Sequence, residues 1–464
     1  MMSLGEAAAA MDASLANGNE GLRFEGVSTD TRSVGRGQLF VAIRGERFDG
    51  HDFLAVARQR GAAAALVDEK HAGSALANER QGVAALPLLV ADDTRRALGR
   101  LGRYWRLRFT PVLIAITGSN GKTTTKEMLA SILRCHAGEG GTLATRGNLN
   151  TDIGVPMTLL GLRASHRYCA VELGMNHAGE IAMLAQIAQP TVALVNNAQR
   201  EHLEFMQSVE AVAAENASVF EALPDDGIAV LNAEDPLAGV FRDKAGARRR
   251  VEFGIEAGTV TGRHVLKSLE SEIVLRTPSG EARAILAIPG LHNVRNALAA
   301  AACAHAAGIP ADVIGAGLAA FRPTTGRLQV KQSAAGATLI DDSYNANPDS
   351  VRAAIDVLAA CPGPTALVLG DMGEVGEKGP EFHAEIGRYA RQKGISALLG
   401  FGPSSRESVV AFGEGAKHFD DWNEIPAGLK NAKTMLVKGS RSMRMERVVA
   451  ALTGELRGGK DVAH

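Results

Sequence analysis

Short apolar runs alternate with helical stretches over the first hundred residues of the chain. Three of the runs have the length of buried strands: residues 38–43, 62–67 and 86–90. Residues 52–60 have the spacing of a helix, and residues 94–108 form a basic helical segment before Pro111. The alternation predicts a small α/β domain that ends near residue 109.

The middle of the chain opens with Val112–Thr117, a continuous apolar run typical of a buried parallel strand. After the segment GSNGK, apolar positions 128, 129, 132 and 133 keep helical spacing, and residues 169–173 and 191–196 predict further strands. We therefore expect a doubly wound parallel sheet. Residues 227–290 contain short β-like runs and suggest an antiparallel extension of the sheet. An Ala-rich helix is predicted after them, at residues 293–307.

The last third of the chain begins the alternation again. Strands are predicted at residues 338–341, 366–369, 397–399 and 434–437, with helices between them. With a second boundary near Thr325, the prediction is an α/β protein of three domains: 1–108, 109–325 and 326–464. The central domain carries the parallel sheet and the third is Rossmann-like. The polar tail, residues 456–464, is expected to be frayed.

Charge and composition exclude several classes of function. The chain has 464 residues, and 50 basic side chains balance 51 acidic ones, so a generic binder of nucleic acid or membrane surfaces is not expected. The four cysteines are scattered, which excludes a zinc ribbon and favours the reducing cytoplasm. The N-terminus is acidic, unlike a signal peptide, and the apolar runs are too short to span a membrane.

The strongest chemical signal lies between the first central strand and its helix. Gly118, Gly121, Lys122 and Thr123 form a GxxGKT loop, in which backbone amides can face a phosphate, the lysine can reach the β- and γ-phosphates, and the threonine hydroxyl can bind Mg²⁺. The common eight-residue pattern has a further glycine where this chain has Ile116, so the match is to a shorter loop. The alternative is a structural glycine turn.

Two more polar side chains follow strands of the predicted parallel sheet. Glu172 ends one strand and His202 comes shortly after the next, so both belong at the sheet edge that carries the phosphate loop. A carboxylate there is suited to Mg²⁺. The alternatives are an ordinary acid at a strand end and a structural or solvated histidine.

Seven motifs, taken together and in this order, resemble the Mur ligases: TGSNGKTTTKEM, RGNLNTDIGVP, VELGMNHAGEI, the HLE after TVALVNNA, LHNVRNALAA, GRLQV and DDSYNANPDS. The resemblance extends from about residue 24 to residue 450. It implies a uridine-nucleotide domain, an ATP domain and a Rossmann-like domain that closes over both. DDSYNANPDS and LGDMGEVGE resemble the D-alanyl-D-alanine pattern, and the DNPR signature of the diaminopimelate or lysine enzymes is absent.

The resemblance implies an ATP-dependent amide ligase of peptidoglycan precursor synthesis. It would join D-alanyl-D-alanine to a UDP-N-acetylmuramoyl-tripeptide through an acyl phosphate, with ATP and Mg²⁺ as cofactors. We expect a cytoplasmic monomer without nucleic-acid partners. The alternatives are a ligase like folylpolyglutamate synthetase, which would be expected to lack the uridine domain, and a phosphate-loop ATPase or binding module that is not a ligase.

Residue roles carried over from the family fall into four sets. Those expected to bind ATP are Gly118, Ser119, Asn120, Gly121, Lys122, Thr123, Thr124, Asn293, Asn296, Arg327 and Asp342. Thr123, Glu172 and His202 are the expected metal ligands, and Lys122, Glu172, His202 and Arg327 the catalytic set. The resemblance places Asn293 and Asn296 beside adenine, Arg327 at the γ-phosphate and Asp342 at the ribose.

The fourth set is expected to bind the other substrates: Ser28, Asp30, Thr31, Arg32, Asp49, Gly50, His51, Asn148, Asn150, Thr151, Lys438, Ser440 and Arg441. The residues up to 51 resemble the uridine-diphosphate site, and those from 148 to 151 resemble contacts to the muramoyl part. From the residues alone, the segment VSTDTRS reads as an Asx-type turn. The segment VKGSRSMRME could meet peptide or phosphoryl oxygens, or be a solvated basic turn.

One position departs from the family pattern. Fourteen residues after the metal-binding histidine, the family usually has a lysine that becomes carbamylated and acts as a carboxylate near the second Mg²⁺. This chain has Asn216 there, which cannot be carbamylated. The neighbouring Glu215 points about 100° away on a helix, so it is not a simple replacement.

Overall fold

The computed structural model describes residues 1–77, 86–429 and 431–455, and forms two compact units. Unit 1 comprises Met1–Ala115, Glu139–Gly174 and Glu180–Thr191. Unit 2 comprises Ile116–Gly138, Met175–Gly179 and the chain from Val192 onwards. The boundaries near residues 109 and 325 stay predictions, and the tail from residue 456 lies outside the described residues.

Unit 1 begins with a five-stranded sheet in the order β2-β7-β6-β5-β4. Its strands are β2 (Ser14–Ala16), β4 (Gly26–Ser28), β5 (Gln38–Val41), β6 (Ala64–Asp68) and β7 (Leu88–Ala91). All pairs are parallel except β2 with β7. Its helices are α1 (Leu4–Met11), η1 (Gly50–Phe53), α2 (Leu54–Gln59), α3 (Glu69–Ala77) and α4 (Thr94–Arg106). The small pair β1 (Met2–Ser3) and β3 (Arg23–Phe24) is antiparallel. The predicted first α/β layer is confirmed.

The remainder of unit 1 contains two parallel strands and the helices that accompany them. Strand β9 (Thr142–Ala144) pairs in parallel with β10 (Tyr168–Glu172), and η3 (Glu139–Gly141), α6 (Gly154–Leu159) and α7 (Glu180–Ala188) accompany them. Helix α4 packs on α6 and α7, where the buried Trp105 indole donates to the Leu162 carbonyl at 3.1 Å. Strand β8 (Val112–Thr117) begins in unit 1 and ends in unit 2.

Unit 2 continues with three parallel strands, β11 (Val192–Val195), β12 (Ile228–Asn232) and β13 (Arg249–Phe253), paired in that order. A separate antiparallel sheet follows, formed by β14 (Thr261–Leu266), β15 (Ser271–Thr277) and β16 (Gly280–Leu286). The prediction for residues 227–290 is therefore right from β14 onward and wrong before it, because β12 and β13 extend the parallel ladder.

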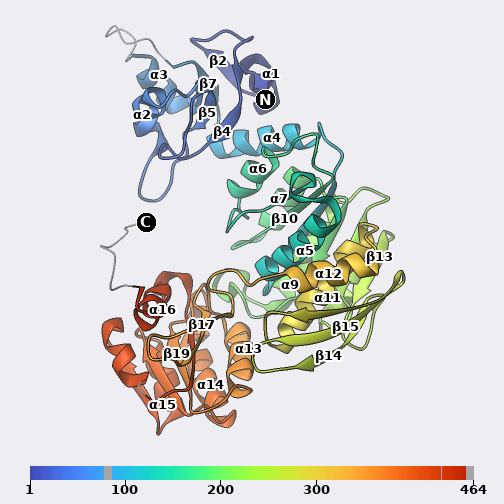
Figure 1. Cartoon of the computed structure of the whole chain (residues 1–464). Helices are drawn as coiled ribbons and strands as arrows, with labels where there is room; N and C mark the ends of the chain where they lie inside the picture. Colours follow the sequence, from blue (N-terminus) through green and yellow to red (C-terminus); the bar gives the residue numbers. More distant parts are fainter. Residues whose placement is uncertain (78–85, 430, 456–464) are drawn as a thin grey trace. The chain divides into compact units, whose positions relative to one another are not determined.

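Helices cover both sets of strands in this part of unit 2. Helix α5 (Lys122–Ala137) packs on α11 (Leu291–Ala306) and α12 (Ala311–Ala320) (Figure 1). Helix α12 also lies against β16. The shorter helices α8 (Leu203–Met206), α9 (Val209–Ala217), η4 (Ser218–Ala222) and α10 (Ala238–Ala245) connect β11 to β13. The predicted Ala-rich helix is confirmed as α11. Its Ala-rich face is buried, because small side chains allow close helix packing.

The last third of the chain has a six-stranded sheet in the order β17-β18-β22-β19-β20-β21. Its strands are β17 (Gln329–Gln332), β18 (Thr338–Asp342), β19 (Thr365–Gly370), β20 (Ala397–Phe401), β21 (Ala416–Phe419) and β22 (Thr434–Lys438), all parallel except β17. Its helices are α13 (Pro348–Ala359), η5 (Gly376–Lys378), α14 (Gly379–Gln392), α15 (Ser405–Phe412), η6 (Trp422–Leu429), η7 (Arg441–Met443) and α16 (Glu446–Thr453). The predicted Rossmann-like alternation is confirmed.

Among the helices that the structure describes, none combines the length and apolar character needed to cross a bilayer.

Candidate active site

The phosphate loop has the predicted strand–loop–helix form. Strand β8 ends at Thr117, α5 begins at Lys122, and the two loop glycines have positive φ angles of 131° at Gly118 and 80° at Gly121. A Cβ atom at Gly121 would lie 2.2 Å from the side-chain oxygen of Asn296. Glycine is therefore required at this position both by the backbone conformation and by the close approach of α11.

Lys122 is folded back over the loop. Its Nζ donates to the carbonyls of Gly118 at 2.6 Å and Ser119 at 3.0 Å, and lies 3.3 Å from both carboxylate oxygens of Glu201. The Lys122 ammonium is thus surrounded by oxygen acceptors of the phosphate loop and Glu201. Glu201, on the loop after β11, is a buried counter-ion that the sequence prediction missed.

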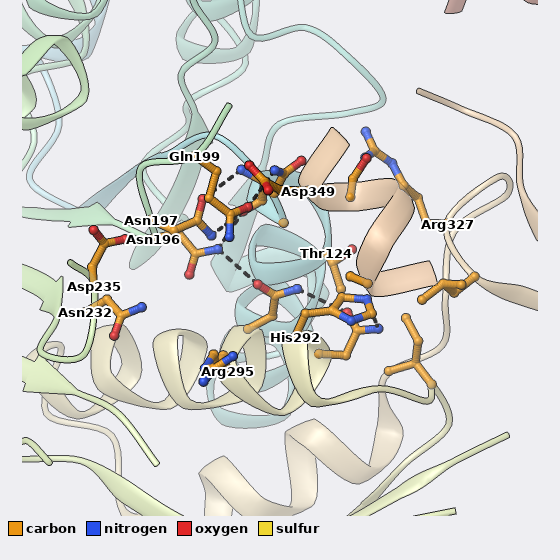
Figure 2. Close-up of a pocket in the computed structure, with 18 of the residues that line it drawn as sticks. Thr124, Asn196, Asn197, Gln199, Asn232, Asp235, His292, Arg295, Arg327 and Asp349 are labelled. Atoms are coloured by element: carbon orange, nitrogen blue, oxygen red, sulfur yellow. Dashed lines mark hydrogen bonds between the residues drawn. The ribbon is translucent and has the colours of Figure 1, made fainter. Parts of the chain in front are cut away.

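A pocket beside the loop collects most of the residues predicted to bind ATP (Figure 2). Asn120, Gly121, Thr124, Asn293, Asn296, Arg327, Asp342 and Lys438 all line it. Asn196 donates to the Asn296 oxygen at 2.9 Å, Asn296 to the Asn293 oxygen at 3.1 Å, and Asn293 to the Pro289 carbonyl at 2.7 Å. The pocket wall is therefore a chain of oriented amides, which suits a ligand with several hydrogen-bonding atoms.

The last third of the chain contributes charged groups to the same pocket. The Arg327 guanidinium is 3.3 Å from the Thr123 hydroxyl and stacks on the Tyr344 ring at 4.0 Å. Lys438 donates to Asp342 at 2.5 Å and to the Asn345 carbonyl at 2.9 Å. Burial raises the pKa of Asp342, while Lys438 and Arg327 oppose that rise. Lys438, assigned from sequence to peptide or phosphoryl oxygens, thus lies in the pocket as the partner of Asp342.

His202 lies between two acidic side chains. Its Nε2 is 3.5 Å from Glu201 Oε1, and its Nδ1 is 2.6 Å from Oε2 of Glu374, a residue of the LGDMGEVGE segment. The contact with His202 lowers the pKa of Glu374, burial opposes this, and Lys122 and His177 assist. Sequence reasoning missed Glu374 as a site residue, although it had singled out its segment.

Glu172 belongs to unit 1, whereas Thr123 and His202 belong to unit 2. Within unit 1 the Glu172 side chain is buried, and its Oε1 accepts a hydrogen bond from Asn150 Nδ2 at 2.8 Å. Asn148 and Thr151 are close to Asn150 in the chain, and the Asn148 carbonyl accepts from the Asn150 amide. A shared metal site for Thr123, Glu172 and His202 stays a prediction.

Mg²⁺ is the metal that the sequence prediction implies, and the donor set in unit 2 fits it. The Thr123 hydroxyl and the carboxylates of Glu201 and Glu374 are hard oxygen donors, and His202 adds a nitrogen. The buried Nδ1 of His202 makes no aligned hydrogen bond despite its short contact with Glu374. The cluster thus combines negative charge with an imidazole that lacks an aligned hydrogen bond at Nδ1.

Asn216 has a structural role. Its side chain is buried, its oxygen accepts from the Thr117 hydroxyl at 2.5 Å, and its amide donates to the Val212 carbonyl at 2.9 Å. Glu215 instead accepts from the Gly179 amide at 2.8 Å. Neither side chain therefore takes the place of a carbamylated lysine in this conformation.

The segment VSTDTRS forms the Asx turn that its residues suggest. Asp30 accepts from the Arg32 amide at 2.8 Å and pairs with the exposed Arg32 guanidinium, while the Ser28 hydroxyl bonds the Asp30 backbone. The contact with Arg32 lowers the pKa of Asp30. Thr31 lies between Asp30 and Arg32 in the same turn, and binding of uridine diphosphate here stays a prediction.

Asp49, Gly50 and His51 also have local structural roles. Asp49 caps η1 through the His51 amide, and a Cβ at Gly50 would lie 2.6 Å from the Ile43 nitrogen. The His51 ring contacts Asp49 through Nδ1 at 2.6 Å and accepts from the Asp68 amide through Nε2 at 3.1 Å. Because Nε2 accepts, Nδ1 carries the proton, and the ring is held in one tautomer.

The two remaining predicted residues lie after β22. The Ser440 amide donates to the Asp371 carbonyl at 2.9 Å, and the exposed Arg441 pairs with Glu446 at 3.0 Å. Arg441 is exposed, as in a solvated basic turn, whereas Ser440 is buried. Their role toward a peptide stays a prediction.

Comparison with known proteins gives a consistent result. Three family models match successive parts of the chain: the Mur ligase family catalytic domain at residues 23–106, the Mur ligase middle domain at 116–304, and the Mur ligase glutamate ligase domain at 326–441. The UDP-N-acetylmuramoyl-tripeptide–D-alanyl-D-alanine ligase of Escherichia coli K12 is 42% identical, over 93% of this chain and 94% of its own length.

Solved structures agree with the sequence relatives. The crystal structure of MurF from Acinetobacter baumannii superposes with a TM-score of 0.88 at 34% identity, covering 98% of this chain and 99% of that one. The MurF ligase of Thermotoga maritima in complex with ADP gives a TM-score of 0.79 at 26% identity, covering 94% and 98%. The chain belongs to the Mur ligase family.

Proposed function

We propose that the protein is the ATP-dependent ligase that joins D-alanyl-D-alanine to UDP-N-acetylmuramoyl-tripeptide in peptidoglycan precursor synthesis. The relatives that match almost the whole chain carry this activity in their names. The structural observation that carries the proposal is the contact between Arg327 and Thr123, because it brings a guanidinium from the last third of the chain to the phosphate loop.

The first chemical step activates a carboxylate. The terminal carboxylate of the tripeptide attacks the γ-phosphorus of ATP, the bond to the bridging oxygen breaks, and ADP leaves with an acyl phosphate formed on the peptide. Charge spreads over the γ-phosphoryl oxygens in this step. Lys122 exchanges its contact with Glu201 for phosphate oxygens, and Arg327 supplies a second positive group there.

The second step forms the amide. The amine of D-alanyl-D-alanine attacks the acyl carbon, and the tetrahedral intermediate expels inorganic phosphate. The chain's task is to align the reactants and to neutralise charge, since holding them in register replaces a bimolecular encounter. Thr123, His202 and Glu172 are the residues proposed to hold Mg²⁺, which supplies further positive charge to the phosphates when bound.

The remaining roles belong to the same proposal. Asn293 and Asn296 are assigned to adenine, Asp342 to the ribose, and the residues from Ser28 to His51 to the uridine nucleotide. We also propose that the protein works as a monomer in the cytoplasm. These assignments rest on the family resemblance together with the grouping of the nucleotide residues in one pocket.

Phosphate release tests the function. Purified protein is supplied with ATP and Mg²⁺, and each UDP-muramoyl peptide is combined with each candidate amine. Release is expected only when ATP, the UDP-muramoyl-tripeptide and D-alanyl-D-alanine are present together. Ligation of glutamate to a folate would instead support a ligase like folylpolyglutamate synthetase. ATP hydrolysis at a rate that neither peptide changes would support a phosphate-loop ATPase.

A further inference from the structure

Glu374 lies in a segment that the proposed mechanism has not used. LGDMGEVGE follows β19, and its Glu374 carboxylate comes within 2.6 Å of His202 Nδ1. The two residues lie 172 positions apart, in the last third of the chain and on the loop after β11, yet both belong to unit 2. The contact therefore joins the loop after β11 to the layer built on β19, at the predicted metal site.

Both residues have an unfavourable backbone conformation. His202 has a φ of 52° and Glu374 a φ of 57°, in the left-handed region that side chains with a Cβ rarely adopt. Strain of this kind persists only where surrounding contacts enforce it, and it concentrates at functional sites. Here the Glu204 amide approaches the Glu374 carbonyl at 3.4 Å, so the turn around Glu374 docks on the start of α8.

The two ring nitrogens of His202 face different groups. Nε2 faces Glu201, which in turn contacts Lys122 of the phosphate loop, whereas Nδ1 faces Glu374. A metal near the phosphates would therefore be reached through Nε2. A histidine that binds metal through one nitrogen commonly gives the proton on the other to a carboxylate, which fixes the ring's tautomer and orientation.

We propose that Glu374 is a positioning residue that holds the Nδ1 proton of His202 and thereby presents Nε2 to the metal. The proposal rests on the proposed function, in which His202 binds Mg²⁺. The carboxylate is at contact distance but not in line with the ring N–H. Its side chain is 47% exposed, and the proposal has it rotate into line with the ring N–H when the metal is bound.

The arrangement has a consequence for the position that departs from the family. The oxygen of Asn216 is taken by the Thr117 hydroxyl, so no anionic group comes from residue 216. Glu374 adds one full negative charge next to His202, and this charge strengthens the imidazole as a metal ligand. Because Glu374 comes from the layer built on β19, metal binding is favoured when its turn is docked on α8.

The test measures metal binding directly. Mn²⁺ is titrated into protein saturated with a non-hydrolysable imido analogue of ATP, and free Mn²⁺ is followed by electron paramagnetic resonance. Glu374→Ala is expected to raise the Mn²⁺ dissociation constant of the complex by about 10- to 100-fold. Glu374→Gln keeps an acceptor oxygen without the charge, so its loss is expected to be smaller.

Glu377→Ala is the matched control, since Glu377 is an exposed carboxylate on the adjoining η5 turn. Its dissociation constant should equal that of the unmodified protein. Equal constants for Glu374→Ala and this control, or no Mn²⁺ binding that depends on the protein, would overturn the proposal. A role limited to docking the turn would lower the melting temperature of Glu374→Ala and leave the Mn²⁺ constant unchanged.

Ligation by the unmodified protein is measured separately. If it fails with every peptide and amine, the proposed function is wrong, while the Mn²⁺ titration still decides the role of Glu374. If ligation succeeds, Glu374→Ala should lower kcat and raise the Mg²⁺ concentration needed for half-maximal rate. Its KM for the UDP-muramoyl-tripeptide should stay that of the unmodified protein.

Discussion

Arg200 forms hydrogen bonds to Asp349 through both its backbone amide and its side chain. The Arg200 amide donates to Asp349 Oδ2 at 2.9 Å, the guanidinium reaches Oδ1 at 2.6 Å, and the same guanidinium contacts Glu385 at 2.8 Å. Arg200 directly precedes Glu201 and His202, whereas Asp349 lines the nucleotide pocket from α13. The loop after β11 and the last third of the chain are thus held together beside the pocket predicted to bind the nucleotide.

The first prediction concerns this contact. Arg200→Ala leaves the partly buried Asp349 without its cation and leaves Glu385 with Arg352 alone. We therefore expect a loss of about 1–3 kcal/mol in unfolding free energy and weaker nucleotide binding. Denaturant unfolding and titration with a fluorescent ATP analogue measure the two effects. Arg352→Ala, which removes a more exposed contact to Glu385, serves as the control. Equal stability of the two variants would contradict the prediction.

Lys122→Ala is expected to lower the rate of ligation by about 10²- to 10³-fold, since it removes a positive group from the transferring phosphoryl. The rate of phosphate release with both peptides present is the measurement. Lys378→Ala, at an exposed lysine on η5, should keep the unmodified rate. A Lys122→Ala enzyme with normal turnover would remove the phosphate loop from the catalytic site.

Lys438→Met should weaken ATP binding most strongly at low pH. Lys438 opposes the rise that burial causes in the pKa of Asp342, so its loss raises that pKa further and a larger fraction of Asp342 is protonated at any given pH. A protonated carboxyl is a poorer acceptor for a ribose hydroxyl, and affinity should recover as pH increases. Nucleotide dissociation constants across a pH series give the answer.

The chain offers a closely matched control for that experiment. Lys331 pairs with the buried Asp341 at 2.9 Å, one residue before Asp342, but neither lines the nucleotide pocket. Lys331→Met should therefore bind ATP like the unmodified protein at every pH. If both variants lose affinity equally, the effect of Lys438 is a general loss of stability.

Asp49 should make unit 1 sensitive to acid. Burial alone would raise its pKa, but hydrogen bonds from the His51 ring and amide and from Arg44 overcome burial and lower it from 3.8 to about 2. The ionised form therefore stabilises the fold above about pH 4, and this contribution is lost as pH falls toward 2. Its size is about 2 kcal/mol.

Hydrogen exchange of residues 44–71 tests this sensitivity. At pH 6, Asp49→Asn should exchange faster than the unmodified protein, and the difference should shrink as pH approaches 2. Comparing the two proteins at the same pH cancels the intrinsic change in exchange rate. Asp52→Asn, at an exposed carboxylate of the same turn, should show little difference at either pH.

Ligation should be indifferent to dissolved carbonate, because Asn216 cannot be carbamylated and its side chain is fully used by Thr117 and Val212. Activity is measured in buffers depleted of and supplemented with carbonate, at limiting Mg²⁺. A rise on supplementation would show that another group forms a carbamate in this enzyme.

Much of the fold was predictable because its signals are local. The apolar run Val112–Thr117 and the loop glycines give a strand, a turn and a helix within 26 residues, from Val112 to Ala137. The strands β12 and β13 were missed because the antiparallel strands after them dominate the pattern of residues 227–290. The ladder that includes them depends on pairing between distant strands.

The candidate site was predictable only in part. Gly118, Lys122 and Thr123 are recognisable from spacing, but Glu201 and Glu374 look like ordinary surface acids until their distances to Lys122 and His202 are known. Contacts such as Asn120 with Asn347 join residues 227 positions apart. No periodicity in the sequence encodes such contacts, because they arise from how folded layers pack.

The row of amides that runs from Asn196 through Asn296 to Asn293 also bears on selectivity between nucleobases. Each side-chain amide donates an N–H to the next oxygen in the row. If one amide alone rotated by 180°, its oxygen would face another oxygen. The orientation of all three is settled before any base arrives. Reversing the entire row would place the Asn293 oxygen against the Pro289 carbonyl, so a base that presents donors where the row presents donors is disfavoured. The row of amides would then exclude bases whose donors and acceptors do not complement it. Its side chains would not have to rearrange around a base that does.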